Sequence, residues 1–178
     1  FISGTGSNLK NLINFSKTKK SPISIDLIIS NTIKAKGLKY SNQYKIKKKI
    51  LNFKNIRIAE KRLLNLLKQN KIQFICLAGF MKILSSKFIK QFNGKIINIH
   101  PSLLPRYKGL NTHSRAIQNK DKFTGCSVHY VTEKLDSGKI IMQKKIKILK
   151  KDTPRSLTKK VLKQEHKLYP KAILKIFN

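Results

Sequence analysis

Asn98 and His100 are the residues of this chain whose types and spacing most directly suggest chemistry. They end a short apolar run, and two residues that are two apart on a β-strand point to the same side. A carboxamide donates hydrogen bonds without titrating, and an imidazolium donates them while carrying a positive charge. Such a pair suits an oxygen atom that becomes negative during acyl transfer. Pro101 and Pro105 stiffen the loop that follows.

Asp136 is a candidate for the carboxylate that such a pair requires. An imidazolium at neutral pH needs a neighbouring carboxylate to raise its pKa, and the chain has only seven acidic residues. Asp136 lies in the stretch TEKLDSGKI, between two expected strands. The sequence Asp-Ser-Gly is equally typical of an ordinary turn. The residues alone leave both interpretations open.

A second candidate site is the stretch GTGSN at residues 4–8, ahead of an expected helix. Glycines let the backbone approach a ligand, and the helix that follows directs N–H groups and its positive dipole end at an anion, typically a phosphate. The stretch lacks the third glycine of a dinucleotide-binding fingerprint and the Gly-Lys-Ser/Thr of a P-loop. A phosphate site and a plain turn are therefore both open.

Other site chemistries fit the sequence less well. No serine or cysteine nucleophile has a plausible base beside it, which disfavours covalent catalysis. Cys76 and Cys126 lie far apart in apolar, strand-like runs, so we expect two buried thiols in a reducing cytosol. None of the four histidines has the His-x-x-x-His or carboxylate spacing of a metal site, so we expect no metal.

The expected secondary structure places both candidate sites at strand ends. Apolar or β-rich runs predict strands at residues 1–3, 23–30, 73–78, 95–99, 126–132 and 139–148. Helical spacing predicts helices from an N-cap at Ser7 or Asn8, at residues 35–43, 58–70, 85–92 and 112–119, and from Thr153-Pro154 to Leu168. We expect Pro170 to stop the last helix.

Strands that alternate with helices through the first hundred residues predict right-handed crossover units. We therefore expect an α/β fold with a mostly parallel central sheet flanked by helices, Rossmann-like, whose late strands can join antiparallel. A length of 178 residues fits one catalytic domain, residues 1–178. Ligands of such a sheet bind beyond the carboxyl ends of its strands, where both candidate sites lie.

The formal net charge of +33 is the most unusual property of the composition. It favours nucleic acid or an anionic surface as a partner. The lysines are spread along the whole chain, however, as AT-rich codons would impose on any protein, so a specific nucleic-acid site is not indicated. No stretch approaches the roughly 18 apolar residues of a membrane span, and the first residues do not resemble a secretory signal. We expect a cytoplasmic protein without a membrane partner.

Several stretches resemble one known family, and they are SGTGSNL, LAGFMKIL, NIHPSLLPRYKGLNTH, GCSVHYVTEKLDSGKII and QEHKLYP. Their order and spacing are similar to those of the phosphoribosylglycinamide formyltransferases, a folate-dependent transferase family of purine biosynthesis. The resemblance covers essentially the whole chain. It implies that the formyl group of 10-formyltetrahydrofolate, a co-substrate, passes to the glycine amine of phosphoribosylglycinamide by direct attack of the amine.

The resemblance also implies roles for individual residues. Asn98 and His100 would stabilise the oxyanion of a tetrahedral intermediate, and Asp136 would hold His100 charged and help relay protons through water. The resemblance further implies a phosphate-binding turn at Gly6, Ser7 and Asn8, a glycinamide-binding residue at Glu165, and a folate site formed by Met81, Lys82, Ile83, Leu84, Asn98 and Arg57.

Two alternatives share or reuse the expected fold. The related methionyl-tRNA formyltransferases would suit a basic chain, but they typically read HGSLLP followed by Gly-Ala-Ala-Pro where this chain reads HPSLLPRYKGLNTH. A basic nucleic-acid-binding domain on the same fold predicts the loss of Asn98, His100 or Asp136, and all three are present. We expect small-molecule substrates as partners, and both a monomer and a homodimer remain open.

Overall fold

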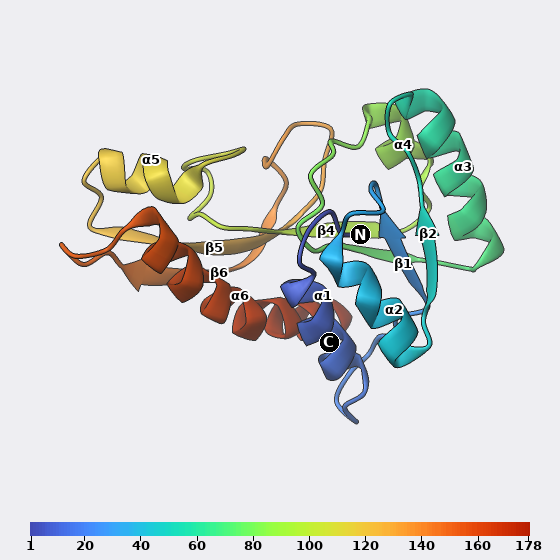
Figure 1. Ribbon diagram of the computed structural model, residues 1–178, viewed down its shortest axis with the longest axis horizontal. Helices are drawn as coiled ribbons and strands as arrows, with labels where there is room; N and C mark the ends of the chain where they lie inside the picture. The colour runs from blue at the N-terminus through green and yellow to red at the C-terminus, as the bar shows by residue number, and fades with distance from the viewer. The chain divides into compact units, whose positions relative to one another are not determined.

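The computed structural model describes all residues, Phe1–Asn178, and divides into two compact units. We call residues 1–97 the N-terminal unit and residues 98–178 the C-terminal unit. The elements of the first are α1 (Ser7–Ser16), β1 (Leu27–Ser30), the 3-10 helix η1 (Lys36–Leu38), α2 (Lys39–Tyr44), β2 (Lys47–Ile50), α3 (Ile56–Gln69), β3 (Phe74–Leu77) and α4 (Ser86–Gln91). Figure 1 labels all of these except η1 and β3. Strand β4 (Lys95–His100) crosses the boundary, and the C-terminal unit continues with α5 (Thr112–Gln118), β5 (Phe123–Tyr130), β6 (Ile140–Lys147) and α6 (Pro154–Phe177).

Residues 1–3, predicted to be a strand, form in the N-terminal unit an extended segment with one isolated parallel bridge, from Ile2 to Ser30. The amide of Ile2 donates to the carbonyl of Ile29 at 2.9 Å, and the amide of Ala78 donates to the carbonyl of Phe1 at 2.9 Å. The segment therefore runs between β1 and the end of β3. On the other side of β1, strand β2 pairs in parallel, with Leu27 opposite Lys47. The parallel pairing that the strand–helix alternation predicts is confirmed.

Strand β2 is the element that the sequence analysis missed. Its residues read KKKI, and all four are exposed. A strand at the edge of a sheet, open to water on both faces, carries no apolar alternation, so a hydrophobic pattern cannot reveal it. Its pairing with the buried strand β1 is what makes it a strand.

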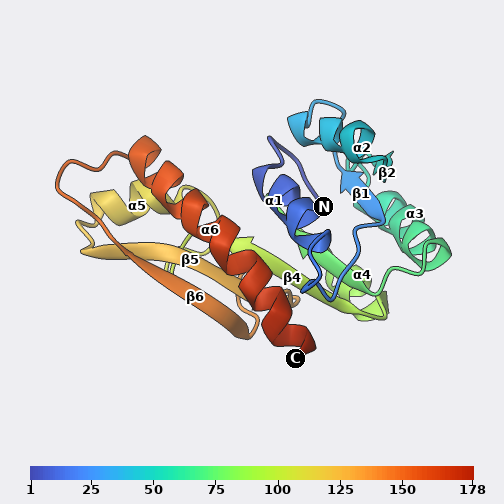
Figure 2. The same ribbon diagram turned by 90° about the horizontal axis from the view of Figure 1, so that it is seen from below.

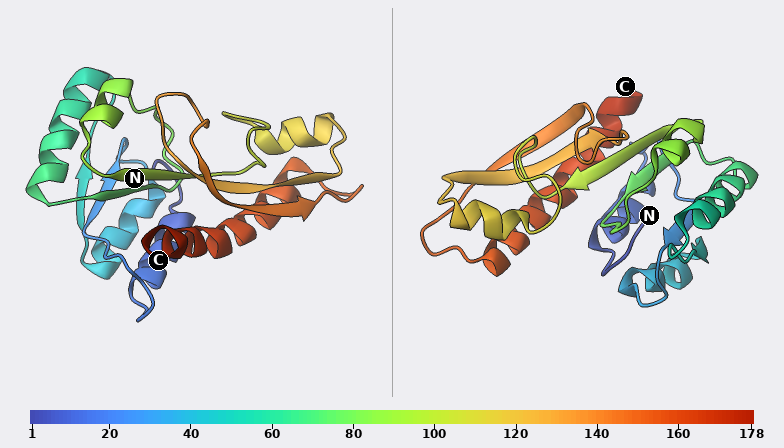
Figure 3. Two further views of the ribbon diagram at one scale, coloured as in Figure 1. Left: turned by 180° about the vertical axis from the view of Figure 1, so that it is seen from behind. Right: turned by 90° about the horizontal axis from the view of Figure 1, so that it is seen from above.

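Helices α3 and α4 lie side by side (Figure 3). The apolar face predicted for α3 is buried through Ala59, Leu63 and Leu67. The side chain of Asn55 caps this helix by accepting from the amide of Ile58 at 3.1 Å. Ser85 caps α4 in the same way, as the expected helix start at residue 85 requires.

The late strands pair antiparallel in the C-terminal unit. Strand β5 neighbours β4 on one side and β6 on the other, and the β5–β6 register runs from Phe123 opposite Lys147 to His129 opposite Ile140. Figure 2 shows α6 lying along this pair of strands. The expectation that the late strands can join antiparallel is thus confirmed. None of the helices combines the length and the apolar composition that crossing a lipid bilayer requires.

Helix α6 continues through Pro170 to Phe177, so the predicted stop at Leu168 is wrong. A proline inside a helix removes one hydrogen bond and costs roughly 3 kcal/mol. Tyr169 and Ile173, on either side of the proline, are both fully buried. Burial of two such large side chains contributes several kcal/mol, which offsets the proline and carries the helix onward.

Replacing Thr153 with alanine is expected to lower the free energy of unfolding by about 1 kcal/mol. The Thr153 hydroxyl accepts from the amide of Ser156 at 3.1 Å, and the Ser156 hydroxyl accepts from the amide of Thr153 at 3.0 Å. The variant leaves the Ser156 amide, at the start of α6, without its acceptor. Urea denaturation measures the loss. Thr158→Ala is the control, because that hydroxyl only bonds back to the Pro154 carbonyl within the same helix. Equal losses in the two variants would contradict a capping role.

Candidate active site

Four polar side chains of the C-terminal unit form one continuous set of contacts, which we call the Asp136 cluster. The Oδ2 atom of Asp136 lies 3.4 Å from Nδ1 of His100, and its Oδ1 atom lies 3.6 Å from Nε2 of His129. The same Nε2 atom of His129 lies 3.3 Å from Nδ2 of Asn98. The structure therefore brings together the three residues predicted to be catalytic and adds His129 between two of them.

Neighbouring strands and a tight turn position the cluster. Asn98 and His100 end β4, and His129 lies on the adjacent strand β5, at the point where the β5–β6 register shifts. Asp136 lies between β5 and β6 with a φ of 45°, in the left-handed region. This conformation is unfavourable for a residue other than glycine. The carboxylate is held by the amide of Gly109, which donates to Oδ2 at 2.9 Å.

Both ring nitrogens of His100 face oxygen acceptors. Its Nε2 atom lies 2.8 Å from the carbonyl oxygen of Tyr107, and its Nδ1 atom faces Asp136. A carbonyl and a carboxylate can only accept, so the doubly protonated imidazolium is the form that satisfies both. Burial lowers the pKa of His100 below its ordinary value, whereas the Tyr107 carbonyl and Asp136 act to raise it. These two acceptors therefore offset part of the cost of placing a charge on a buried ring.

Asp136 is held in its ionised form. Burial by itself raises the pKa of this carboxyl group, but the neighbouring His129 ring, the hydrogen bond from the Gly109 amide and the His100 ring together bring it below its ordinary value. A carboxylate that is ionised at neutral pH supplies the counter-charge that a His100 imidazolium needs.

The loop after His100 is anchored to β5 and β6. The Ser127 hydroxyl donates to the carbonyl of Ser102 at 2.6 Å and accepts from the amide of Leu104 at 3.1 Å. The side chain of Gln143 donates to the carbonyl of Leu104 at 2.9 Å. These bonds fix the first half of the loop, and the second half delivers the Tyr107 carbonyl to His100.

The predicted phosphate turn lies in the N-terminal unit, at the start of α1. Gly6 is the N-cap, with a φ of 73°, and no side chain caps this helix end, so the prediction of Ser7 or Asn8 as the cap is wrong. A Cβ atom on Gly6 would lie 2.7 Å from the Cα atom of Gly37. Only glycine fits there, and a helix start without a side-chain cap is the arrangement that anion sites use.

The predicted folate segment also lies in the N-terminal unit, between β3 and α4. Met81 and Ile83 are each 66% exposed, whereas Leu84 is buried. The amide of Met81 donates to the hydroxyl of Ser3 at 2.7 Å. The segment thus presents two apolar side chains to the surface from a backbone that is tied at both ends.

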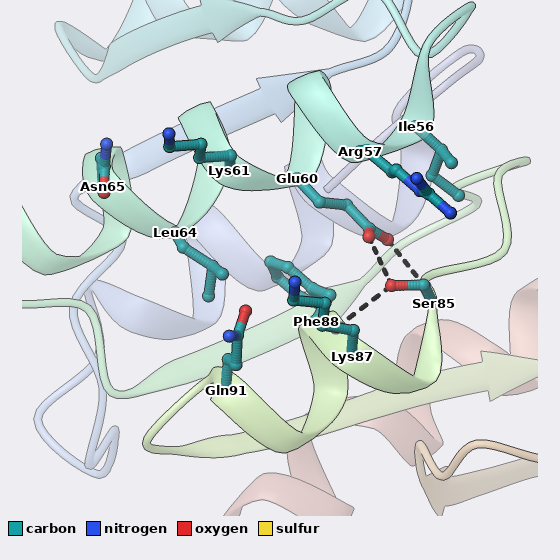
Figure 4. A pocket seen from close by; sticks show the side chains of 10 residues that line it. All are labelled: Ile56, Arg57, Glu60, Lys61, Leu64, Asn65, Ser85, Lys87, Phe88 and Gln91. Atoms are coloured by element: carbon teal, nitrogen blue, oxygen red, sulfur yellow. Dashed lines mark hydrogen bonds between the residues drawn. The ribbon is translucent and has the colours of Figure 1, made fainter.

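Arg57 lines a groove of about 1130 Å³ between α3 and α4, together with Ile56, Glu60, Lys61, Leu64, Asn65, Ser85, Lys87, Phe88 and Gln91. The groove contains none of residues 81–84, so the structure does not join Arg57 to the rest of the predicted folate segment through it. Figure 4 shows the carboxylate of Glu60 reaching Ser85 across this groove. The amide of Ser85 donates to Oε1 of Glu60 at 2.7 Å, and the Ser85 hydroxyl donates to Oε2. Buried Glu60 therefore fixes the backbone that directly follows Leu84.

Glu165, predicted to bind the glycinamide, is buried on α6. The nearby thiol of Cys126 is also buried. Burial raises the pKa of that thiol to about 12, and the negative charge of Glu165 contributes to the increase. Cys126 is therefore protonated at neutral pH and cannot serve as a nucleophile.

Cys126 and Cys76 are both free, and Cys76 is partly exposed, so the expectation of two buried thiols holds only for Cys126.

His129 is the functional candidate that the sequence analysis missed. A signal for it exists, because Ser127 and His129 are two apart on β5 and both are buried polar residues. That spacing places both side chains on one face of the strand. Their partners lie on the loop and on the neighbouring strand, and only the pairing of β4 with β5 reveals them.

A family model described as formyl transferase matches residues 1–173. The chain is 39% identical over 175 residues to phosphoribosylglycinamide formyltransferase of Escherichia coli, covering 97% of this chain and 82% of that protein. It is 41% identical to the human trifunctional purine biosynthetic protein adenosine-3, covering 97% of this chain but 17% of that protein. The chain thus spans about one sixth of the trifunctional relatives that it matches.

Solved structures agree with this similarity. A phosphoribosylglycinamide formyltransferase from Brucella melitensis has a TM-score of 0.93 and 41% identity, covering 99% of this chain and 92% of that one. The corresponding values for the protein from Anaplasma phagocytophilum are a TM-score of 0.90, 41% identity, 97% and 81%. The predicted α/β fold, Rossmann-like with antiparallel late strands, is confirmed.

Proposed function

Because this chain belongs to the formyl transferase family, we propose that it transfers the formyl group of 10-formyltetrahydrofolate to the glycine amine of phosphoribosylglycinamide. Relatives that the chain covers over most of their length carry the name phosphoribosylglycinamide formyltransferase. The observation that carries the proposal is the Asp136 cluster, in which one carboxylate lies beside His100 and the Asn98 carboxamide is reached through His129. Residues 1–178 act in this proposal as one catalytic domain.

The reaction proceeds by direct attack of the substrate amine on the formyl carbon. A C–N bond forms, the carbonyl oxygen becomes an oxyanion, and a tetrahedral intermediate results. Asn98 and His100 donate hydrogen bonds to that oxyanion. The bond from the formyl carbon to N10 of the folate then breaks, and N10 receives the proton that the attacking amine loses. Asp136 keeps His100 charged and accepts and returns the proton through water.

The Tyr107 carbonyl lies where the substrate oxygen would accept a hydrogen bond from Nε2 of His100. It lies 2.8 Å from Nε2, which is the separation expected for an oxyanion at the same donor. The substrate oxygen therefore takes the place of this carbonyl when transfer occurs, so the Tyr107 carbonyl leaves His100 during turnover. The first half of the loop stays anchored through Ser127.

The remaining predicted residues hold the two substrates. The start of α1, at Gly6, Ser7 and Asn8, receives the substrate phosphate. Glu165 binds the glycinamide. The exposed apolar side chains of the segment Met81, Lys82, Ile83 and Leu84 contact the folate rings, with Asn98 near the formyl group and Arg57 toward the anionic glutamate tail. Both substrates are anions, so the net charge of +33 raises their encounter rate without requiring nucleic acid.

The proposed function predicts a clear choice of acceptor. Purified protein is given 10-formyltetrahydrofolate with phosphoribosylglycinamide and initiator methionyl-tRNA in competition. We expect formylglycinamide ribonucleotide as the product and no formylmethionyl-tRNA above background, and mass spectrometry of both acceptors measures this. Preferred formylation of the tRNA, retained in high salt where nonspecific attraction to polyanions is lost, would overturn the proposal.

A further inference from the structure

We infer that His129 is a positioning residue that sets the orientation of the Asn98 carboxamide, so that its amino group and not its oxygen is presented for transfer. The catalytic part of this inference, which concerns kcat, rests on the function proposed above. Its structural part, which concerns the protonation of one ring and the direction of one amide, stands on the contacts within the C-terminal unit alone.

The backbone determines which nitrogen of His129 carries the proton. Nδ1 lies 2.9 Å from the carbonyl oxygen of Tyr130. A carbonyl oxygen only accepts, so Nδ1 must carry a hydrogen atom. In the neutral ring Nε2 is then unprotonated and is an acceptor. His129 is 2% exposed, so water does not compete for that acceptor.

Asn98 supplies the donor that this acceptor requires. Its Nδ2 atom lies 3.3 Å from Nε2 of His129. Turning the carboxamide by 180° would place the Asn98 oxygen against an unprotonated ring nitrogen, and two acceptors in contact repel each other. Neutral His129 therefore selects one of the two orientations of the carboxamide. The amino group has two N–H bonds, so one binds His129 and the other remains for the substrate.

Asp136 is the competing neighbour of the same nitrogen. Its Oδ1 atom lies 3.6 Å from Nε2 of His129, which is beyond ordinary hydrogen-bond distance. The other charged or titratable group in the cluster is His100, whose nitrogens are engaged by Tyr107 and by the far oxygen of Asp136. The nearer of the two neighbours of Nε2 is thus Asn98, and protonation of Nε2 would abolish the hydrogen bond from Asn98.

The orientation of the Asn98 carboxamide matters for formyl transfer, because its amino group donates hydrogen bonds and its oxygen only accepts them. An oxyanion needs a donor, and an Asn98 side chain that turned freely would present its oxygen to the developing negative charge part of the time. Loss of the anchor is worth about one hydrogen bond, so we expect kcat to fall roughly tenfold. The Michaelis constants should change little, because the ground-state contacts of the substrates do not depend on this donor.

The first test measures the ring without any substrate. Protein labelled with ¹⁵N at histidine should show His129 with a pyrrole-like nitrogen at Nδ1 and a pyridine-like nitrogen at Nε2 at neutral pH. Two protonated nitrogens, or the opposite tautomer, would overturn the inference. This measurement remains decisive if formyl transfer to phosphoribosylglycinamide is not found, so the failure of the proposed function and the failure of the inference are distinguishable.

The second test uses paired variants at one position. His129→Leu removes the acceptor at similar volume, whereas His129→Gln places a carbonyl oxygen near the position of Nε2. The leucine variant should lose roughly tenfold in kcat, and the glutamine variant should recover most of it. Val128→Ala is the control, because it alters a buried apolar neighbour on the same strand and should lower stability without a comparable change in kcat. Equal losses in the leucine and glutamine variants would count against the inference.

A double-mutant cycle identifies the residue through which His129 acts. If His129 works through Asn98, His129→Leu has no further effect on kcat in the Asn98→Ala background. The same tenfold loss in both backgrounds would overturn the inference. A loss that persists with Asn98→Ala but vanishes with Asp136→Asn would overturn it too, because His129 would then act on the carboxylate.

Discussion

Replacing His100 with alanine lowers kcat for formyl transfer by roughly 10²- to 10³-fold, the loss typical of removing one oxyanion donor. The hydrogen bond from His100 is made to an oxygen that is negative only in the transition state and the intermediate, so the substrates should bind almost as tightly as before. Steady-state kinetics with each substrate varied in turn measures both quantities. Unchanged turnover would remove His100 from the mechanism.

A second substitution at the same position separates hydrogen bonding from charge. His100→Gln retains an N–H donor but cannot become a cation. If the donor alone matters, the glutamine variant should keep most of the activity. If the charge is also required, its activity should lie nearer to that of the alanine variant. The buried position of His100, beside Asp136 and the Tyr107 carbonyl, leads us to expect the second result.

Replacing Asp136 with asparagine lowers kcat by roughly 10²-fold and moves the pH profile. Asp136 acts to raise the pKa of His100, against burial, which lowers it. Without the carboxylate the pKa of His100 falls further below its ordinary value. The active protonated ring is lost as the pH rises through that pKa, so the high-pH limb of kcat should shift to lower pH. Measurement of kcat against pH for both proteins tests the direction.

The control for this shift is Asp152→Asn, which removes one carboxylate away from the Asp136 cluster. Asp152 pairs with Lys160 at 2.7 Å beside the start of α6, and that lysine together with the Leu149 amide lowers the pKa of Asp152 to about 2. The variant should be less stable at neutral pH but should keep the parent profile of kcat. A high-pH limb that stays in place with Asp136→Asn, or moves equally in both variants, would contradict the role of Asp136.

Features that depend on short stretches of chain could be predicted from the sequence. The pairing of Asn98 and His100 on one side of a strand follows from the two-residue period of β structure. The start of α6 follows from Thr153 and Pro154, and the buried face of α3 from leucines at helical spacing. Each of these depends on residues at most a few turns apart, which is why the pattern of residue types is sufficient.

Features that depend on distant partners could not be predicted in this way. Strand β2 exists because β1 lies beside it. Helix α6 passes Pro170 because Tyr169 and Ile173 are buried by other elements. His129 meets Asn98 across two neighbouring strands, 31 residues apart in the chain. No local period of polar and apolar residues encodes such a contact.

The sequence by itself thus determined the α/β class, the strand end that carries Asn98 and His100, and the family resemblance that singled out Asp136. Only the tertiary structure decided that the carboxylate lies between two imidazole rings and that a backbone carbonyl occupies the donor of one of them. The reason is physical. Hydrogen bonds and charges act through space at about 3 Å, and chain folding alone decides which groups come that close.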